Sequence, residues 1–134
     1  MKNVYGALLL GTTVTVLALL SACSAPTRPE AQRLRVFNIG AASINDLVVR
    51  FPGSTVTFGT VPAGATTSFQ KVPSGVYGYA AYDFRADSIV IRQLVLDWTG
   101  EEPLDGEDFT FSLEMTPGPT GAPSLRLVAV TREK

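Results

Sequence analysis

The sequence predicts an all-β domain, an antiparallel β-sandwich of about seven or eight strands behind an N-terminal signal helix. Three observations predict it. Apolar residues recur at every second position in most segments after residue 33. Turn residues, mainly Gly, Pro and Ser, separate these segments at intervals of about eight to twelve residues. No segment of the same region has the three-to-four residue spacing of an amphipathic helix.

The strands follow from this alternation, taken in chain order. In the first, Leu34 and Val36 alternate with Arg35 and Phe37, and in the seventh Phe109, Phe111, Leu113 and Met115 alternate with polar residues. Side chains two apart share one face of a strand, so each run has one face suited to a core. The predicted strands are residues 34–39, 47–51, 56–58, 66–71, 76–84, 89–98, 109–115 and 125–131.

Two turns have nearly the same sequence, Val61-Pro62-Ala63-Gly64 and Val72-Pro73-Ser74-Gly75. Proline presets the second turn position and glycine permits the exit, so both are predicted hairpin corners. The second, continued by Val76 and Tyr77, is similar to turns of the transthyretin-like and carboxypeptidase-regulatory β-sandwiches. Together with Arg35-Val36-Phe37-Asn38, the first resembles uncharacterised Ig-like domains of bacterial lipoproteins. The resemblance implies an Ig-like or transthyretin-like sandwich and no particular function.

The N-terminus has the order of a secretory signal: one positive charge at Lys2, an apolar run over residues 4–20, and small residues before Cys23. Leu20-Ser21-Ala22-Cys23 resembles the lipobox of bacterial lipoproteins at all four positions. The resemblance implies recognition by signal peptidase II, cleavage before Cys23, and covalent diacylglycerol and N-acyl (palmitate-type) lipid on that residue. An uncleaved membrane helix and an ordinary secretory signal are the alternatives.

The expected organisation is a signal peptide over residues 1–22, the lipidated Cys23 and a flexible tether over 23–32, and a β-sandwich over 33–134. By the same resemblance, Ser24 directs the protein to the outer membrane rather than the inner one, on a face that the sequence leaves open. The tether contains Pro26 and Pro29, which favour an extended chain. The membrane, through the lipid, and an envelope protein are the expected partners.

Composition narrows the function classes. The chain has no His and only one Cys, so a Ser-His-Asp triad, a Cys-His pair and a disulfide are excluded. Eleven basic and twelve acidic residues give no basic excess for nucleic acid. We therefore expect no enzyme, and no cofactor beyond the lipid. A non-enzymatic interaction or structural module is the first expectation, a carbohydrate or Ca²⁺ binder the alternative, and a carboxylate-dependent hydrolase the weakest.

Two sets of residues are candidate sites. Carboxylates between residues 97 and 108, with no Lys or Arg among them, are weak candidates for Ca²⁺, although they lack a recognised ligand spacing. Aromatic side chains near the middle of the chain form a possible binding surface, if they are exposed rather than part of the core. The acidic set is Asp97, Glu101, Glu102, Asp105, Glu107 and Asp108, and the aromatic set is Tyr77, Tyr79, Tyr82 and Trp98.

Overall fold

The computed structural model describes residues 31–134, and the expected signal peptide, Cys23 and most of the tether lie outside the described residues. The described chain is all-β, as predicted, and has eight strands. No helix in this region is long and apolar enough to cross a membrane. The strands are β1 (Gln32–Asn38), β2 (Ile44–Phe51), β3 (Ser54–Val61), β4 (Gln70–Val72), β5 (Ala81–Ala86), β6 (Ile89–Gln93), β7 (Asp108–Pro117) and β8 (Pro123–Glu133).

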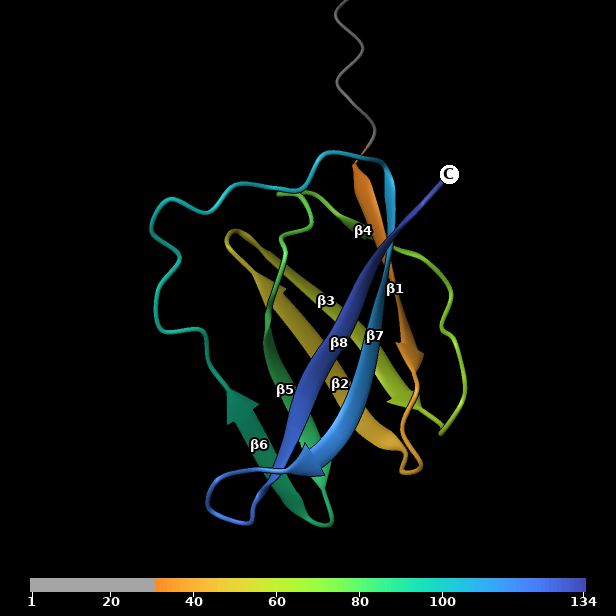
Figure 1. Cartoon of the computed structure of the whole chain (residues 1–134), viewed down its shortest axis with the longest axis vertical. Coiled ribbons are helices and arrows are strands. Elements are labelled where there is room, and N and C mark those ends of the chain that lie inside the picture. Colours follow the sequence, from red (N-terminus) through yellow and green to blue (C-terminus); the bar gives the residue numbers. More distant parts are fainter. Residues whose placement is uncertain (1–30) are drawn as a thin grey trace, which may run out of the picture.

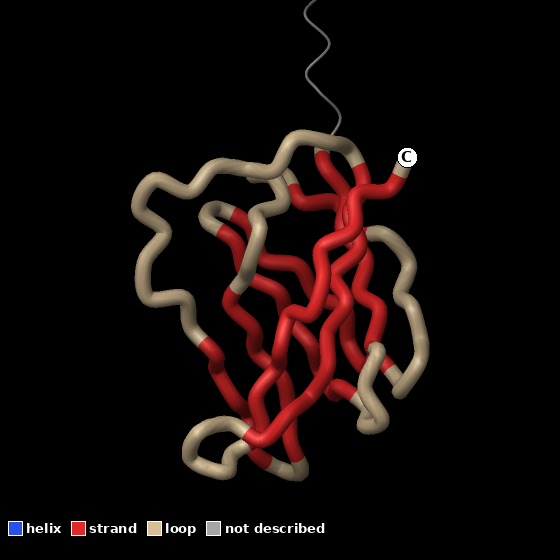
Figure 2. The backbone as a smooth tube through the Cα atoms, in the orientation of Figure 1, coloured by secondary structure: helices blue, strands red, loops and turns tan. Residues whose placement is uncertain are grey.

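The strands form two four-stranded sheets, which face each other as a sandwich (Figures 1 and 2). Sheet A has the order β4-β1-β7-β8, and sheet B has the order β3-β2-β5-β6. Every neighbouring pair is antiparallel except β1 and β7, which run parallel. The edge strands of the two sheets are therefore β4 and β8 in one and β3 and β6 in the other.

The core lies between the sheets and is made by the alternating apolar residues that predicted the strands. Leu34 and Val36 of β1 and Phe111 of β7 are completely buried, as are Leu47 and Val49 of β2 in the opposite sheet. Burial of a side chain of this size stabilises the fold by about 1.5–3 kcal/mol relative to leaving it exposed. The described domain contains no Cys, so this packing takes the place that disulfides have in many exported domains.

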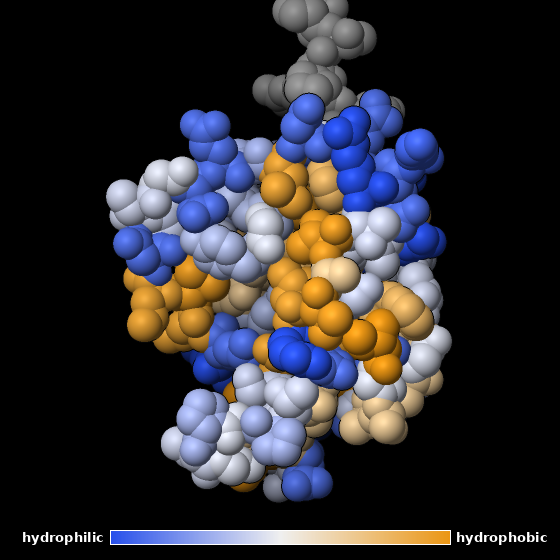
Figure 3. Space-filling model, in the orientation of Figure 1, coloured by the Kyte–Doolittle hydropathy of each residue, from blue (hydrophilic) through white to orange (hydrophobic). Residues whose placement is uncertain are grey.

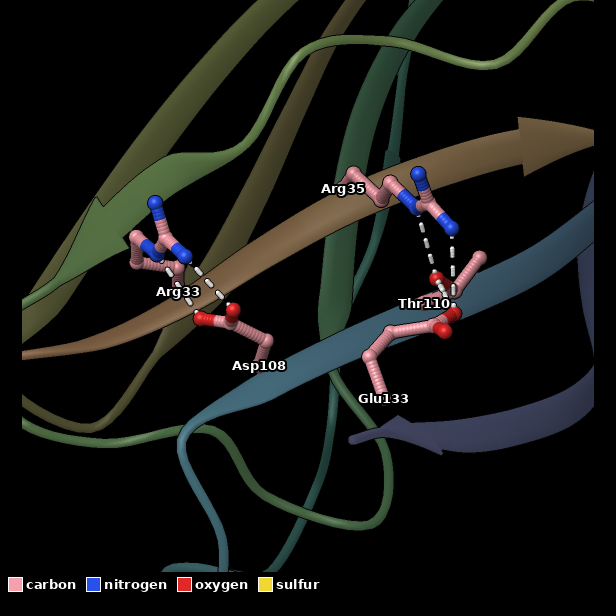
Figure 4. Close-up of polar contacts among 5 residues, drawn as sticks. All are labelled: Arg33, Arg35, Asp108, Thr110 and Glu133. Carbon is pink, nitrogen blue, oxygen red and sulfur yellow. Dashed lines mark hydrogen bonds and ion pairs between the residues drawn. The ribbon is translucent and has the colours of Figure 1, made fainter.

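The parallel pairing of β1 with β7 is supported by polar contacts on the outer face of sheet A (Figure 4). Arg33 lies opposite Asp108 in the register and donates two hydrogen bonds to its carboxylate, at 2.7 and 2.6 Å. Arg35 lies opposite Thr110, donates to its hydroxyl at 2.9 Å, and reaches Glu133 of β8 at 3.1 Å. These contacts connect β1 to β7 and β8, two strands that lie far from it in the sequence.

Three predicted strands are longer than the observed ones. Residues 66–69 make only an isolated bridge, from Thr66 to Phe37, before β4 begins. Residues 76–80 are not a strand, because Val76 instead accepts a hydrogen bond from Leu104 and donates one to the Gln32 side chain. Residues 94–98 follow β6 without any strand partner among the described residues. Strand-forming composition is present in all three. Residues 76–80 and 94–98 lack a neighbouring strand, whereas residues 66–69 lie beside β1 but pair with it irregularly, since the Val36 N–H donates to the Thr67 hydroxyl instead of to a backbone carbonyl.

Candidate docking edge on β6

Side chains of β6 alternate in exposure, and the alternation continues three residues beyond the strand. Ile91, Gln93 and Val95 are half-buried. The residues between them form what we call the outer row, and its apolar members have large exposed fractions of 60%, 68% and 96% at Val90, Leu94 and Leu96. Residues 94 and 95 thus continue the side-chain alternation of the strand after its pairing has ended, and the chain bends at Leu96, whose side chain remains exposed. The outer row consists of Val90, Arg92, Leu94 and Leu96.

An apolar outer row reverses the usual arrangement of an antiparallel sheet, whose solvent-facing side is ordinarily polar. Figure 3 shows the apolar residues of this region gathered at the left margin, beyond the end of β6. Ile89, at the start of the strand, is also exposed, at 66%, but the alternation places it on the opposite face from the outer row. Scattered exposed apolar residues are ordinary on proteins, but a contiguous set marks a contact surface.

The backbone groups along the free edge of β6, the edge that faces away from β5, are also unpaired in the described part of the chain. Among the strands of residues 31–134, β6 is the last of its sheet and pairs only with β5, through a two-residue turn at Asp87 and Ser88. In an antiparallel ladder the hydrogen-bonding direction alternates along the strand, and a two-residue turn begins with a bonded pair, here Ala86 and Ile89. The N–H and C=O groups of Val90, Arg92 and Leu94 therefore face outward. An open row of such groups is a template for another strand.

Gln93 holds β6 against the opposite sheet. Its side-chain Nε2 donates to the carbonyl of Leu125 at 2.7 Å, and its Oε1 accepts from the Leu125 N–H at 2.9 Å. The hydroxyl of Ser124 donates to the same Oε1 at 3.0 Å. The amide of Gln93 thus binds the edge of β8 as a neighbouring strand would, and the outer row is fixed relative to both sheets.

The far end of residues 94–97 is fixed by aromatic stacking. Trp98 stacks on Tyr79 with ring centroids 4.9 Å apart and meets Tyr77 edge-on at 5.6 Å. The Tyr79 hydroxyl donates to the carbonyl of Asp97 at 3.1 Å. Partial burial, together with the carboxylate of Glu101, raises the pKa of the Tyr79 hydroxyl above its usual value. Three of the four predicted aromatic residues therefore form one cluster, which positions the chain beyond β6.

Tyr82, the fourth predicted aromatic residue, lies apart from this cluster. It is in the core on the inner face of β5, with 2% of its surface exposed. Its hydroxyl has no hydrogen-bond partner in the part of the chain that the structure describes, and burial raises the pKa of this group strongly. It contributes to packing and does not belong to an exposed surface.

The acidic residues from 97 to 108 are spread along the connection between β6 and β7. Asp97 accepts a hydrogen bond from the N–H of Thr99 at 2.7 Å, and hydrogen bonding from the Thr99 side chain and then from this N–H lowers the pKa of Asp97. Asp108 is at the other end, and its ion pair with Arg33 lowers its pKa. In residues 31–134 no three acidic side chains come together in a group that could hold a metal ion. Glu101 and Glu102 are exposed and follow closely after Trp98, which we call the aromatic anchor.

Gln32 fixes the other end of this connection. Its Nε2 donates to the carbonyls of Leu104 and Gly106 at 2.6 and 2.8 Å, and its Oε1 accepts from the Val76 N–H at 2.6 Å. Pro103 packs directly against Gly75, where a Cβ atom would lie 2.6 Å from the proline ring. Residues 94–107 are therefore held at both ends.

Two surface hollows lie elsewhere. One, of about 430 Å³, is lined by Leu104, Phe109 and Val130, with Asp105 and Arg132 beside them. The other, of about 250 Å³, is near Met115 and Pro117 in the β7–β8 hairpin. Neither combines apolar side chains with an unpaired strand edge over the length found on β6.

The sequence indicated a strand at β6 but not the exposure of its outer row. The available signal was the composition of residues 89–96, in which Arg92 is the only charged residue and an acidic stretch follows. Comparison with protein-family models, with curated proteins and with solved structures finds no match to this chain.

Proposed function

We propose that this chain is a lipid-anchored protein of the bacterial cell envelope that acts as a non-enzymatic interaction module, with β6 as its docking element. The observation that carries the proposal is the outer row, where Leu94 and Leu96 are 68% and 96% exposed beside an unpaired strand edge. Burial of those side chains against a partner would be favourable, at about 25 cal/mol for each Å² of apolar surface removed from water.

The anchor rests on Leu20-Ser21-Ala22-Cys23 and the signal that precedes it. Cys23 carries the lipid in this proposal, and Ser24 favours the outer membrane. The eight residues from 24 to 31 would reach roughly 25 Å if extended, at about 3.1 Å per residue. Two or three acyl chains on one residue give stable attachment, which a single chain does not. The domain is then held near the membrane while β6 stays accessible to an envelope partner.

The interaction proposal is tested by placing a photoreactive benzoylphenylalanine at position 94 in the full chain and irradiating intact cells. We expect one reproducible crosslinked protein. The matched control is position 57, an exposed threonine on β3 at the opposite edge of the same sheet. If positions 94 and 57 give the same products, or position 94 gives none, β6 is not a docking element.

The anchor is tested separately with Cys23→Ser. We expect this variant to lose palmitate labelling and to leave the membrane fraction. Persistence of both properties in the variant would refute the anchor. A soluble variant that still crosslinks its partner through position 94 would support the docking role independently of localisation.

A further inference from the structure

Resting on the proposed function, we infer the chemistry of the partner: an extended segment of another protein that adds to β6 as a strand. Its residues alternate, with apolar side chains opposite Val90 and Leu94 and an acidic one opposite Arg92, and a further apolar side chain meets Leu96 at the bend that follows. A Lys or Arg lies at the end of the segment that meets Asp97, Glu101 and Glu102.

The extended conformation follows from the backbone of β6. When a partner displaces water from the outward N–H and C=O groups of Val90, Arg92 and Leu94, an extended chain can satisfy all of them, because it offers its own backbone groups at strand spacing. A helix has used these groups internally and cannot do so. Main-chain hydrogen bonds of this kind provide affinity, while alternate side chains provide specificity.

The side-chain pattern follows from the outer row. Residues directly opposite each other on two strands are about 4.5–5.5 Å apart at Cβ, so apolar residues are favoured opposite Val90 and Leu94. Arg92 has no ion pair among residues 31–134. An acidic residue opposite it would be favourable, whereas a like charge would be unfavourable.

The Lys or Arg inferred for the partner segment follows from the negative charge beyond the end of the outer row. No Lys or Arg occurs from residue 97 to residue 108, and the exposed Glu101 and Glu102 follow the aromatic anchor closely. Since Trp98 holds this part of the chain in place, the negative charge is presented at one defined end of the docking edge. A partner segment with a Lys or Arg at that end complements it.

A second copy of the chain fits this edge poorly. Two β6 strands related by a two-fold axis pair antiparallel, and Arg92 then faces Val90, Leu94, Leu96 or another Arg92, depending on where the pairing is centred. No such register gives Arg92 an acidic partner. An anionic lipid surface is disfavoured as well, because it carries the same sign of charge as Glu101 and Glu102.

The inference is tested by panning a random nine-residue peptide library against the purified full chain, immobilised through a C-terminal tag. We expect the selected peptides to share apolar residues at alternate positions, one acidic residue within that series, and a Lys or Arg beyond one end. Leu94→Asp should weaken their binding about tenfold or more, as for a central contact residue. Thr57→Asp, on the opposite edge, should leave it unchanged.

Charge exchange sharpens the test. With Glu101→Lys and Glu102→Lys combined, the selected peptides should carry an acidic residue at the end in place of the basic one. With Arg92→Glu, the acidic residue in the series should become basic. Circular dichroism melting of each variant checks that it folds. Peptides without an alternating pattern, or a pattern that ignores these exchanges, would overturn the inference.

The same experiments separate this inference from the proposed function. A partner crosslinked at position 94 whose mapped contact segment is helical, or lacks both charges, overturns the strand chemistry and leaves the docking role intact. Crosslinks only to another copy of the chain, or only to lipid, overturn the partner class proposed here. The absence of any crosslink at position 94 removes the docking role itself.

Discussion

Gln93 binds both backbone groups of Leu125, its Nε2 donating to the carbonyl and its Oε1 accepting from the N–H. The two residues belong to different sheets, so a side-chain amide provides the contact that holds β6 near β8. Gln32 has the same role at the opposite end of the connection between β6 and β7. The Gln93 amide and, beyond it, the stack of Trp98 on Tyr79 determine where the outer row is presented.

Gln93→Ala should lower the free energy of unfolding by about 1–3 kcal/mol, because both backbone groups of Leu125 lose their partner in a half-buried position. Urea denaturation of the full chain measures this. Arg92→Ala, a change at the neighbouring exposed residue, is the control and should stay within about 0.5 kcal/mol of the unmodified protein. Equal effects of the two changes would show that the Gln93 contact does not stabilise the fold.

Tyr82→Phe should leave stability unchanged or raise it by about 1 kcal/mol. The hydroxyl is buried without a hydrogen-bond partner among the described residues, so removing it relieves a desolvation cost and keeps the aromatic packing. Thermal or urea unfolding gives the sign. Tyr79→Phe provides the contrast, because it removes the bond to the Asp97 carbonyl and should be slightly destabilising. A clear loss of stability for Tyr82→Phe would imply a hidden partner for its hydroxyl, such as a buried water.

Gly75→Ala should destabilise the fold through two effects. The residue has φ +98°, which disfavours any side chain, and its new Cβ would lie 2.6 Å from a carbon of Pro103. Gly64→Ala is a matched control, since Gly64 has φ +74° and no atom near the position of its added Cβ. Backbone strain of about 1 kcal/mol is expected for both, with a further loss of about 1–3 kcal/mol at Gly75 from the overlap. Similar losses would mean that Pro103 moves aside freely.

Acid should weaken the fold through Asp108 and Glu133. Hydrogen bonds from Arg33 to Asp108, and from Thr110 and then Arg35 to Glu133, hold the pKa of each carboxyl below its usual value. A lowered pKa in the folded state means that the stabilisation is present above the ordinary values of about 4 and is lost as pH falls through the lowered ones. Unfolding free energy measured from pH 6 to pH 2 should therefore decrease.

The variant Asp108→Asn with Glu133→Gln should have a lower stability near pH 6 and a shallower decrease in acid. Glu102→Gln, which removes an exposed carboxylate without an ion pair among the described residues, should keep the slope of the unmodified protein. If the double change leaves the slope unaltered, other groups are responsible for the acid dependence.

The sequence by itself determined the strands and their inward faces. Alternation such as Phe109, Phe111 and Leu113 is a local property, because side chains two apart share a face whatever lies beyond them. The eight predicted strands and the sandwich class were accordingly confirmed, apart from strand ends and one parallel pair. The lipobox is equally local, and its functional assignment stays a prediction.

Only the tertiary structure decided which strands became neighbours and which side chains stayed exposed. The pairing of Arg33 with Asp108 joins residues 75 positions apart, and the sandwich buries Tyr82 while leaving Tyr79 near the surface. Residues 94–98 have strand-forming composition but lack a neighbouring strand, so their pairing ends at Gln93. Whether Leu94 and Leu96 are exposed depends on whether another segment of the chain packs over them. That is decided by contacts between residues distant in the sequence. The docking edge is therefore visible only in the folded chain.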